Sequence, residues 1–105
     1  MTDIQQIMKM GQELQAKVRE LQASLESEEL EASSGGGMVT ATVNGKGDVK
    51  SIRIDATVVD PADVEMLEDL VVAAVSEAQS KARSFSEEHM RKAAGGLPMQ
   101  LPGLF

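Results

Sequence analysis

The chain has 105 residues, enough for one small domain, and its 42% hydrophobic and 26% charged residues are ordinary for a globular protein. With two Phe, no Trp, no Tyr and no Cys, it lacks the residues for base-stacking platforms, aromatic-lined ligand pockets, disulfides and thiolate chemistry. The net charge of −7, from 17 acidic and 10 basic residues, taken alone disfavours nucleic acid as a partner.

No stretch of the sequence is apolar for long enough to span a bilayer, and the first ten residues lack the basic and then apolar layout of a signal peptide. We therefore expect a cytoplasmic protein with no membrane partner. A monomer of this size buries only about two-thirds of its unfolded surface, so oligomerisation would help to stabilise it.

The first predicted element is a helix with a narrow apolar face. Its apolar positions follow a 3-4-3-4 spacing, which places them on one stripe of about three heptads. These seam positions are Ile4, Ile7, Gly11, Leu14, Val18, Leu21 and Leu25. Two arrangements fit the pattern: the helix lies on the protein's own sheet, or it packs on a partner helix from its own chain or from a second one.

Residues 30–55 predict two or three antiparallel strands. Apolar and polar residues alternate through 39–43 and again through 51–55, as they do in half-buried strands. A turn at Gly35–Gly37 precedes the first of these runs, and residues 30–33 could add a third strand. Asn44-Gly45 is a strong hairpin signal, while Gly47 makes a bulge or a longer loop equally compatible with the sequence.

A second long helix is predicted after residue 60. We expect Asp60 as its N-cap, Pro61 at its first position and Asp63 in its first turn, near the positive end of the helix dipole. Its apolar stripe contains Val64, Leu67, Val71, Ala74, Ala78 and Phe85. The helix is expected to run to Ala94 with a cap at Gly95-Gly96, and Ser84 and Ser86 could mark a kink or break.

The predicted order is therefore helix, two or three strands, helix, which is an α+β fold in a single domain over residues 1–105. Residues 95–105 form an apolar tail rich in Gly and Pro that is too short to fold alone. It would either pack onto the body of the protein or remain disordered.

No group of residues in the sequence predicts catalysis, a metal site or a cofactor. His89 is the single histidine and has no set of ligands at metal-binding spacing, so we interpret it as a surface residue of the second helix. The acidic residues of 60–69 lack the spacing of a calcium loop, and a strand rather than a helix follows the Gly35–Gly37 turn, unlike a P-loop. We expect neither an enzyme nor a small-molecule substrate.

Charge is distributed unevenly along the chain. Residues 55–69 hold six acids and no base, and residues 26–31 hold four Glu. Residues 77–92 carry four cations and three acids, while residues 1–25 carry three of each. Glu77–Lys81, Glu87–Arg91 and Glu88–Lys92 are spaced for i,i+4 ion pairs, so a helix with solvated ion pairs explains these three cations as well as DNA binding does. Arg83 is the exception, because Gln79 precedes it at i−4.

The order and spacing of several segments resemble a known family. "GGGMVTATVNG", "MLEDLVVAAV" and the terminal "GGLP" are the most specific of these segments, and the match covers nearly the whole chain. The series resembles the YbaB/EbfC family of bacterial nucleoid-associated proteins. The resemblance implies a tweezer-like homodimer that binds double-stranded DNA in the nucleoid, with an α-β-β-β-α fold and a role in chromosome organisation or transcriptional modulation.

The resemblance also implies that the helical parts contact DNA. The cations on those parts of this chain are Lys9, Lys17, Arg19, Lys81, Arg83, Arg91 and Lys92. Three cations of the hairpin could add a secondary contact: Lys46, Lys50 and Arg53. Because the sequence contains no base-reading module, we expect phosphate contacts and DNA shape to dominate recognition. The alternative is a dimeric adaptor that binds a protein through the apolar tail from Leu97 to Phe105.

Overall fold

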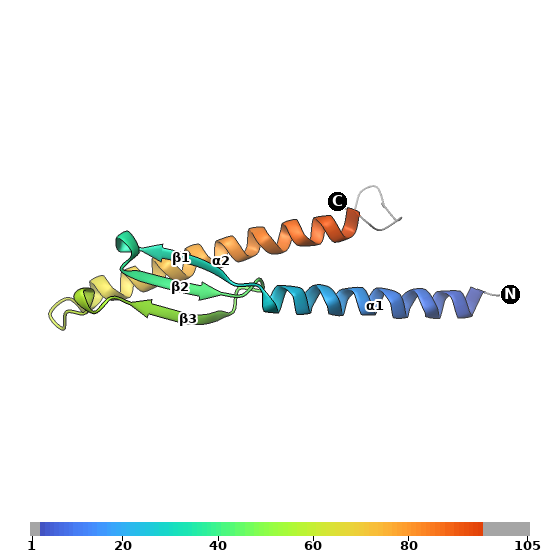
Figure 1. Ribbon diagram of the computed structural model, residues 1–105, viewed down its shortest axis with the longest axis horizontal. Helices are drawn as coiled ribbons and strands as arrows, with labels where there is room; N and C mark the ends of the chain where they lie inside the picture. Colours follow the sequence, from blue (N-terminus) through green and yellow to red (C-terminus); the bar gives the residue numbers. More distant parts are fainter. Residues whose placement is uncertain (1–2, 96–105) are drawn as a thin grey trace.

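The computed structural model describes residues 3–95 of the chain, with side chains to residue 93, and Figure 1 shows the order of its elements. The helices are α1 (Asp3–Ser27) and α2 (Val64–Gly95), and the strands are β1 (Leu30–Ser34), β2 (Val39–Val43) and β3 (Val49–Ile54). The expected α-β-β-β-α order is confirmed, including the third strand. The predicted tail beyond residue 95 lies outside the described residues.

The three strands form one antiparallel sheet in the order β1-β2-β3. Ala32 of β1 lies opposite Ala41 of β2, which in turn lies opposite Ile52 of β3. A register shift between Thr42 and Val43 interrupts the pairing of β2 with β3 close to the loop that joins them. The strand at the centre is therefore β2, and β3 lies at the edge of the described sheet.

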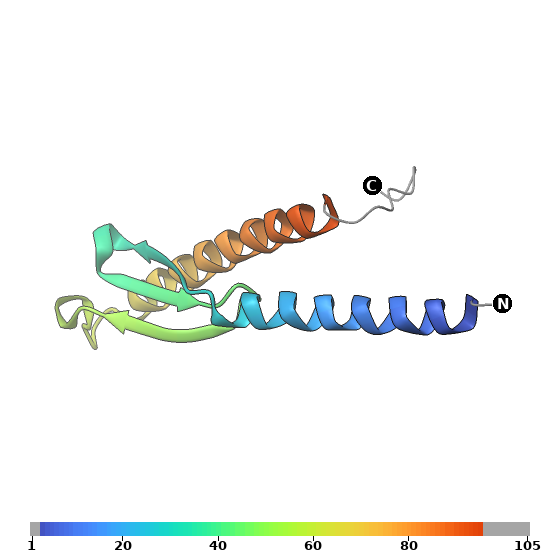
Figure 2. The same cartoon turned by 45° about the vertical axis from the view of Figure 1, so that its right-hand side comes forward.

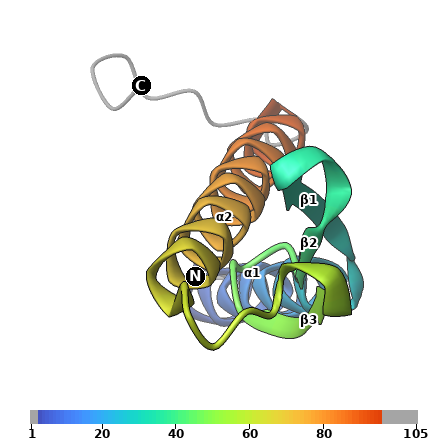
Figure 3. The ribbon, with the colours of Figure 1, turned by 90° about the vertical axis from the view of Figure 1, so that its left-hand side faces the viewer.

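Helix α2 packs across one face of the sheet, over β1 and β2 (Figure 3). Its contact surface is made of small side chains four residues apart, which allow the helix to approach the sheet closely. The buried core consists of Ala32, Val39, Ala41, Val43, Ala74, Ala78 and Ala82. No extensive contact joins α2 to β3, so all six residues of β3 are exposed.

The turn at Gly35–Gly37, η1, requires glycine for two separate reasons. All three residues have positive φ angles, of 60°, 68° and 94°, which side chains with a Cβ rarely adopt. A Cβ on Gly35 would also lie 2.9 Å from Cδ2 of Leu70. The Ser34 hydroxyl donates a hydrogen bond to the Leu70 carbonyl, so the turn is fastened to α2.

The beginning of α2 differs from the prediction. The helix starts at Val64, and its N-cap is Asp63, whose Oδ1 accepts a hydrogen bond from the Met66 N–H at 3.2 Å. Asp60 instead closes a turn before the helix, because its Oδ1 accepts from the Ala62 N–H at 2.9 Å. Asp60 as N-cap and Pro61 as first helical residue are therefore wrong, and α2 continues without a break past the predicted interruption at residues 84–86.

The molecule is strongly elongated, because both helices extend beyond the sheet. Its radius of gyration is 20.1 Å and its extents are 74 × 24 × 17 Å, whereas a compact chain of this length has a radius of about 13 Å. Figures 1 and 2 show α1 and the second half of α2 leaving the same end of the sheet in the same general direction. We call these two projecting segments, residues 3–27 and 79–95, the arms.

The apolar seam of α1 does not lie on the protein's own sheet. Leu25 is the buried residue of this helix, while Ile4, Ile7, Leu14 and Val18 are exposed. The first of the two arrangements considered from the sequence is therefore wrong. The second, in which the seam packs on a partner, stays a prediction.

Candidate nucleic-acid interface

The loop from Asn44 to Asp48 contacts both arms at the point where they leave the sheet, which we call the foot of the arms. On one side, the Gly45 N–H donates a hydrogen bond of 2.7 Å to the Leu25 carbonyl, in the last turns of α1. On the other side, Nε2 of Gln79 on α2 donates to the Gly47 carbonyl at 3.0 Å. The direction in which each arm leaves the sheet is thus fixed by the backbone of one short loop.

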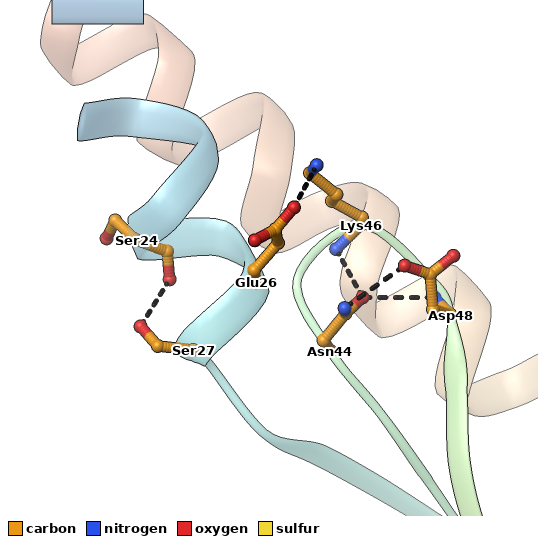
Figure 4. Close-up of polar contacts among 6 residues, drawn as sticks. All are labelled: Ser24, Glu26, Ser27, Asn44, Lys46 and Asp48. Atoms are coloured by element: carbon orange, nitrogen blue, oxygen red, sulfur yellow. Dashed lines mark hydrogen bonds and ion pairs between the residues drawn. The ribbon is translucent and has the colours of Figure 1, made fainter. Parts of the chain in front are cut away.

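Asn44 organises this loop from within (Figure 4). It is only 1% exposed, and its Oδ1 accepts hydrogen bonds from the N–H groups of Lys46 at 2.9 Å and Asp48 at 3.0 Å. Its Nδ2 donates to the Asp48 carboxylate at 3.2 Å. The connection is therefore the longer loop that the sequence allowed rather than a two-residue Asn-Gly turn, and Gly47 supplies its one positive φ, of 91°.

A hollow of about 500 Å³ opens where the arms meet the loop. It is lined by Leu25 from α1, by Gly45, Lys46 and Gly47 from the loop, and by Gln79, Arg83, Ser86 and Glu87 from α2. The hollow is not strongly basic, since Glu87 accompanies Arg83, and Lys46 is paired with Glu26 at 2.7 Å. The structure brings together two predicted DNA contacts here, Lys46 and Arg83, which are far apart in the sequence.

The three predicted cations of α1 are exposed along that arm. Lys9, Lys17 and Arg19 form no hydrogen bond or ion pair with the rest of the described chain. Because each residue turns a helix by about 100°, Lys17 and Arg19 lie on widely separated faces. A single flat surface could therefore not contact all three, whereas a ligand that follows the arm could reach them in turn.

The four predicted cations of α2 differ in whether they form a hydrogen bond or an ion pair within the chain. Nζ of Lys81 donates to the Glu31 carbonyl on β1 at 2.9 Å, so this side chain is directed to the sheet edge rather than into the gap between the arms. Arg91 pairs with Glu88 at 2.8 Å. Arg83 and Lys92 are exposed and form no such contact within residues 3–93.

None of the three predicted i,i+4 ion pairs forms in the described part of the chain. Lys81 bonds to a backbone carbonyl, Arg91 pairs at i,i+3, and Lys92 has no acidic neighbour in contact. The second helix is therefore not the uniformly ion-paired surface that its sequence suggested. Sequence reasoning also missed Glu26 and Gln79, which position the loop and whose partners lie too far along the chain to show in any local pattern.

The secondary cations Lys50 and Arg53 lie exposed on β3, at the edge of the described sheet. His89 stacks on Phe85, with ring centroids 5.5 Å apart, one helical turn away on α2.

Over residues 3–93, no cluster of three or more His, Asp or Glu side chains could hold a metal ion. Neither helix contains a described stretch that is long and apolar enough to cross a membrane.

These features define a small α+β protein whose two helical arms carry exposed cations beyond a three-stranded sheet. The model of the YbaB/EbfC DNA-binding family matches residues 1–97, and the chain belongs to this family. The resemblance noted from the sequence is thereby confirmed.

Relatives of known name agree with this assignment. The chain is 48% identical to a nucleoid-associated protein of Granulibacter bethesdensis over 97 residues, which cover 92% of this chain and 91% of that one. It is 50% identical to a nucleoid-associated protein of Alkaliphilus metalliredigens over 99 residues, covering 94% and 85%. The crystal structure of an uncharacterized protein from Helicobacter pylori matches with a TM-score of 0.60 at 21% identity, covering 83% and 96%, and supports the fold.

Proposed function

We propose that this protein is a homodimer that binds double-stranded DNA through its helical arms and acts in the nucleoid. Membership of a DNA-binding family is the observation that carries the proposal. The names of the relatives, which describe them as nucleoid-associated, support the location and a role in chromosome organisation or transcriptional modulation.

The distribution of charge supports the arms as the part that meets DNA. The six acids of residues 55–69 lie at the end of the molecule opposite the arms, in the loop after β3 and the first turns of α2 (Figure 1). The arm segments are together close to neutral, with three bases and four acids in 3–27 and four bases and two acids in 79–95. DNA phosphates would be repelled from the acidic end, so the duplex would approach the arms despite the overall charge of −7.

The exposed strand β3 supports a dimer. Its unpaired edge and its apolar side chains Val49, Ile52 and Ile54, which are 44%, 40% and 39% exposed, form a continuous row beside α2. Exposed strand edges with apolar residues are sites where another chain pairs, and proteins that keep such an edge uncovered are prone to aggregate. A second copy would cover this edge and would double the number of arms available to one duplex.

Recognition would rest on phosphates and on DNA shape, because the arms offer separated cations and no helix-turn-helix. If a dimer neutralises about six phosphates, log affinity falls with log salt at a slope near −5. The adaptor alternative depends on residues 97–105, which lie outside the described residues, and it stays a prediction.

The test is fluorescence anisotropy of a short random duplex titrated with the protein from roughly 50 to 300 mM salt. We expect saturable binding with the steep slope of log affinity against log salt. A variant with Arg83→Glu and Lys92→Glu should bind more weakly, and its slope should be smaller in magnitude by about two or more for the dimer. A control with the same number of substitutions, Ala73→Glu with Ser76→Glu, adds half as much negative charge at exposed positions on the sheet half of α2. A salt slope near zero, or equal losses in both variants, would contradict the proposal.

A further inference from the structure

The apolar seam of α1 is left uncovered by the rest of the described chain. Ile4, Ile7, Leu14 and Val18 are between 45% and 73% exposed, although they recur with the regularity of a buried face. Contacts with other described elements are sparse along α1 and concentrate at Leu25 beside the loop. A stripe of this length left in water is unusual and indicates a surface that something covers.

The seam has a notch in its middle. Gly11 occupies a seam position between Ile7 and Leu14, and a Cβ built there would meet nothing within 4 Å. Glycine inside a helix is less favourable than alanine, because it loses more conformational freedom on folding. Since no described residue uses the space above Gly11, the notch is suited to a side chain from a segment that lies across the seam.

The borders of the seam indicate what kind of segment that is. Helices that pair with helices usually carry charges beside the seam, which select the partner. The corresponding positions here are Asp3, Met8, Met10, Gln15, Lys17, Gln22 and Ser24. Only two of these seven residues are charged, so the seam is suited to an uncharged apolar segment better than to a second charged helix.

This chain contains such a segment. Residues 97–105, with the sequence LPMQLPGLF, have no charge, five large apolar side chains and two prolines, and they follow the end of α2. Because a proline disfavours helix in the residue before it, the sequence favours an extended course. Nine residues in such a course span about 28 Å, which includes the crossing from α2 to α1, and the part of the seam from Gly11 to Val18 spans about 11 Å.

We propose that residues 97–105 lie along the α1 seam of the same chain, with an apolar side chain over Gly11. The two arms extend in the same direction from the sheet, so a segment that begins at the end of α2 can cross to α1 (Figure 2). The contact would cover the part of the seam around Gly11 and hold the arms at a set separation. The proposal does not depend on DNA binding.

The absence of cysteine allows a direct test on the full chain. A nitroxide spin label is attached at Gln100→Cys, the single polar residue of the segment, and the loss of amide NMR signal along α1 is measured. One sample carries the isotope and the spin label on the same chain, diluted into excess unlabelled protein. A second carries the isotope and the spin label on different chains. We expect loss of signal around the seam of α1 in the first sample only.

Two variants separate docking from chance proximity. Leu14→Lys places a charge in the seam and should restore the α1 signals, whereas Ala16→Lys, on the far face of the same turn, should leave the loss unchanged. Signal loss in the second sample would assign the seam to a second copy and overturn the proposal. Undiminished α1 signals in the first sample would overturn it as well.

Discussion

At the scale of single residues, the loop at the foot of the arms leaves no room for change at Gly45. A Cβ there would lie 2.8 Å from the Leu25 carbonyl oxygen and 3.1 Å from its Cα, both of which are backbone atoms of α1. We expect Gly45→Ala to lower the free energy of unfolding by about 1–3 kcal/mol, because the loop and the helix must move apart. Urea denaturation followed by circular dichroism measures this loss.

The neighbouring residue supplies the control. Lys46→Ala removes the ion pair with Glu26 but pushes no atom against α1. A partly exposed pair of this kind contributes about 0–1 kcal/mol. Equal losses in the two variants would mean that the close approach of Gly45 to α1 is not what holds the arm.

Asp55 provides a residue-level prediction for pH. The Thr57 hydroxyl, at 2.7 Å, and then the Thr57 N–H, at 2.9 Å, donate to its carboxylate and lower the pKa of Asp55 from its ordinary value of 3.8. A lowered pKa means that the charged form is favoured in the folded state, so this contribution to stability is present above pH 3.8 and is lost as the pH falls below it.

The substitution Thr57→Val removes the hydroxyl and keeps the backbone donor, so the pKa of Asp55 should rise towards 3.8 but stay below it. An NMR titration of the Asp55 carboxyl carbon in both proteins measures the difference. An unchanged midpoint in the variant would show that the Thr57 hydroxyl is not the main cause of the shift.

At the scale of elements, the contact of α2 with the sheet depends on small side chains. Ala78 is fully buried and packs in the cluster that contains Ala41 and Val43 of β2. Ala78→Leu should lower the free energy of unfolding by about 1–3 kcal/mol, since the helix must lift from the sheet to admit the larger side chain. Val72→Leu, at a position that is 63% exposed on the same helix, should change it by about 0.5 kcal/mol or less.

The elements themselves could be predicted well from the sequence, because their signals are local. The alternation in residues 39–43, the spacing on α2 and the three glycines of η1 each report on neighbours within a few residues. The start of α2 was predicted three residues early, because Asp60 and Asp63 are both good caps and only the turn closed by Asp60 decides between them.

The candidate site could be predicted only as a set of cations. Whether a cation is free depends on partners that are distant in the chain: Glu26 lies 20 residues from Lys46, and Glu31 lies 50 residues from Lys81. No periodicity contains that information. The exposure of the α1 seam was equally hidden, because an apolar stripe has the same spacing whether or not the chain itself covers it.

At the scale of the whole molecule, we propose that two copies join at β3, because this strand lies at the edge of the described sheet and exposes Val49, Ile52 and Ile54. In Figure 1 β3 lies within the sheet and the arms extend beyond it, so a dimer interface at β3 would leave the arms of both copies uncovered. A dimer formed there also stabilises each copy by mass action, so the midpoint of urea denaturation should rise with protein concentration.

The substitution Ile52→Lys tests this dimer interface and its effect on DNA binding together. Ile52 is 40% exposed in the single chain, so lysine should be tolerated by the fold while its charge disfavours burial in a dimer. Sedimentation equilibrium should then give a folded monomer. The salt slope of DNA binding should fall to roughly half, because one pair of arms neutralises half as many phosphates.

A lysine placed elsewhere separates the effect of disrupting the dimer interface from the effect of the added charge. Val59→Lys introduces the same charge at a position that is 54% exposed, in the connection between β3 and α2. It should leave both the dimer and the salt slope unchanged. If Ile52→Lys remained dimeric, the copies would join at another surface. A monomer that kept the full salt slope of DNA binding would mean that one pair of arms already makes all of the phosphate contacts. Dimerisation would then contribute to stability and not to DNA affinity.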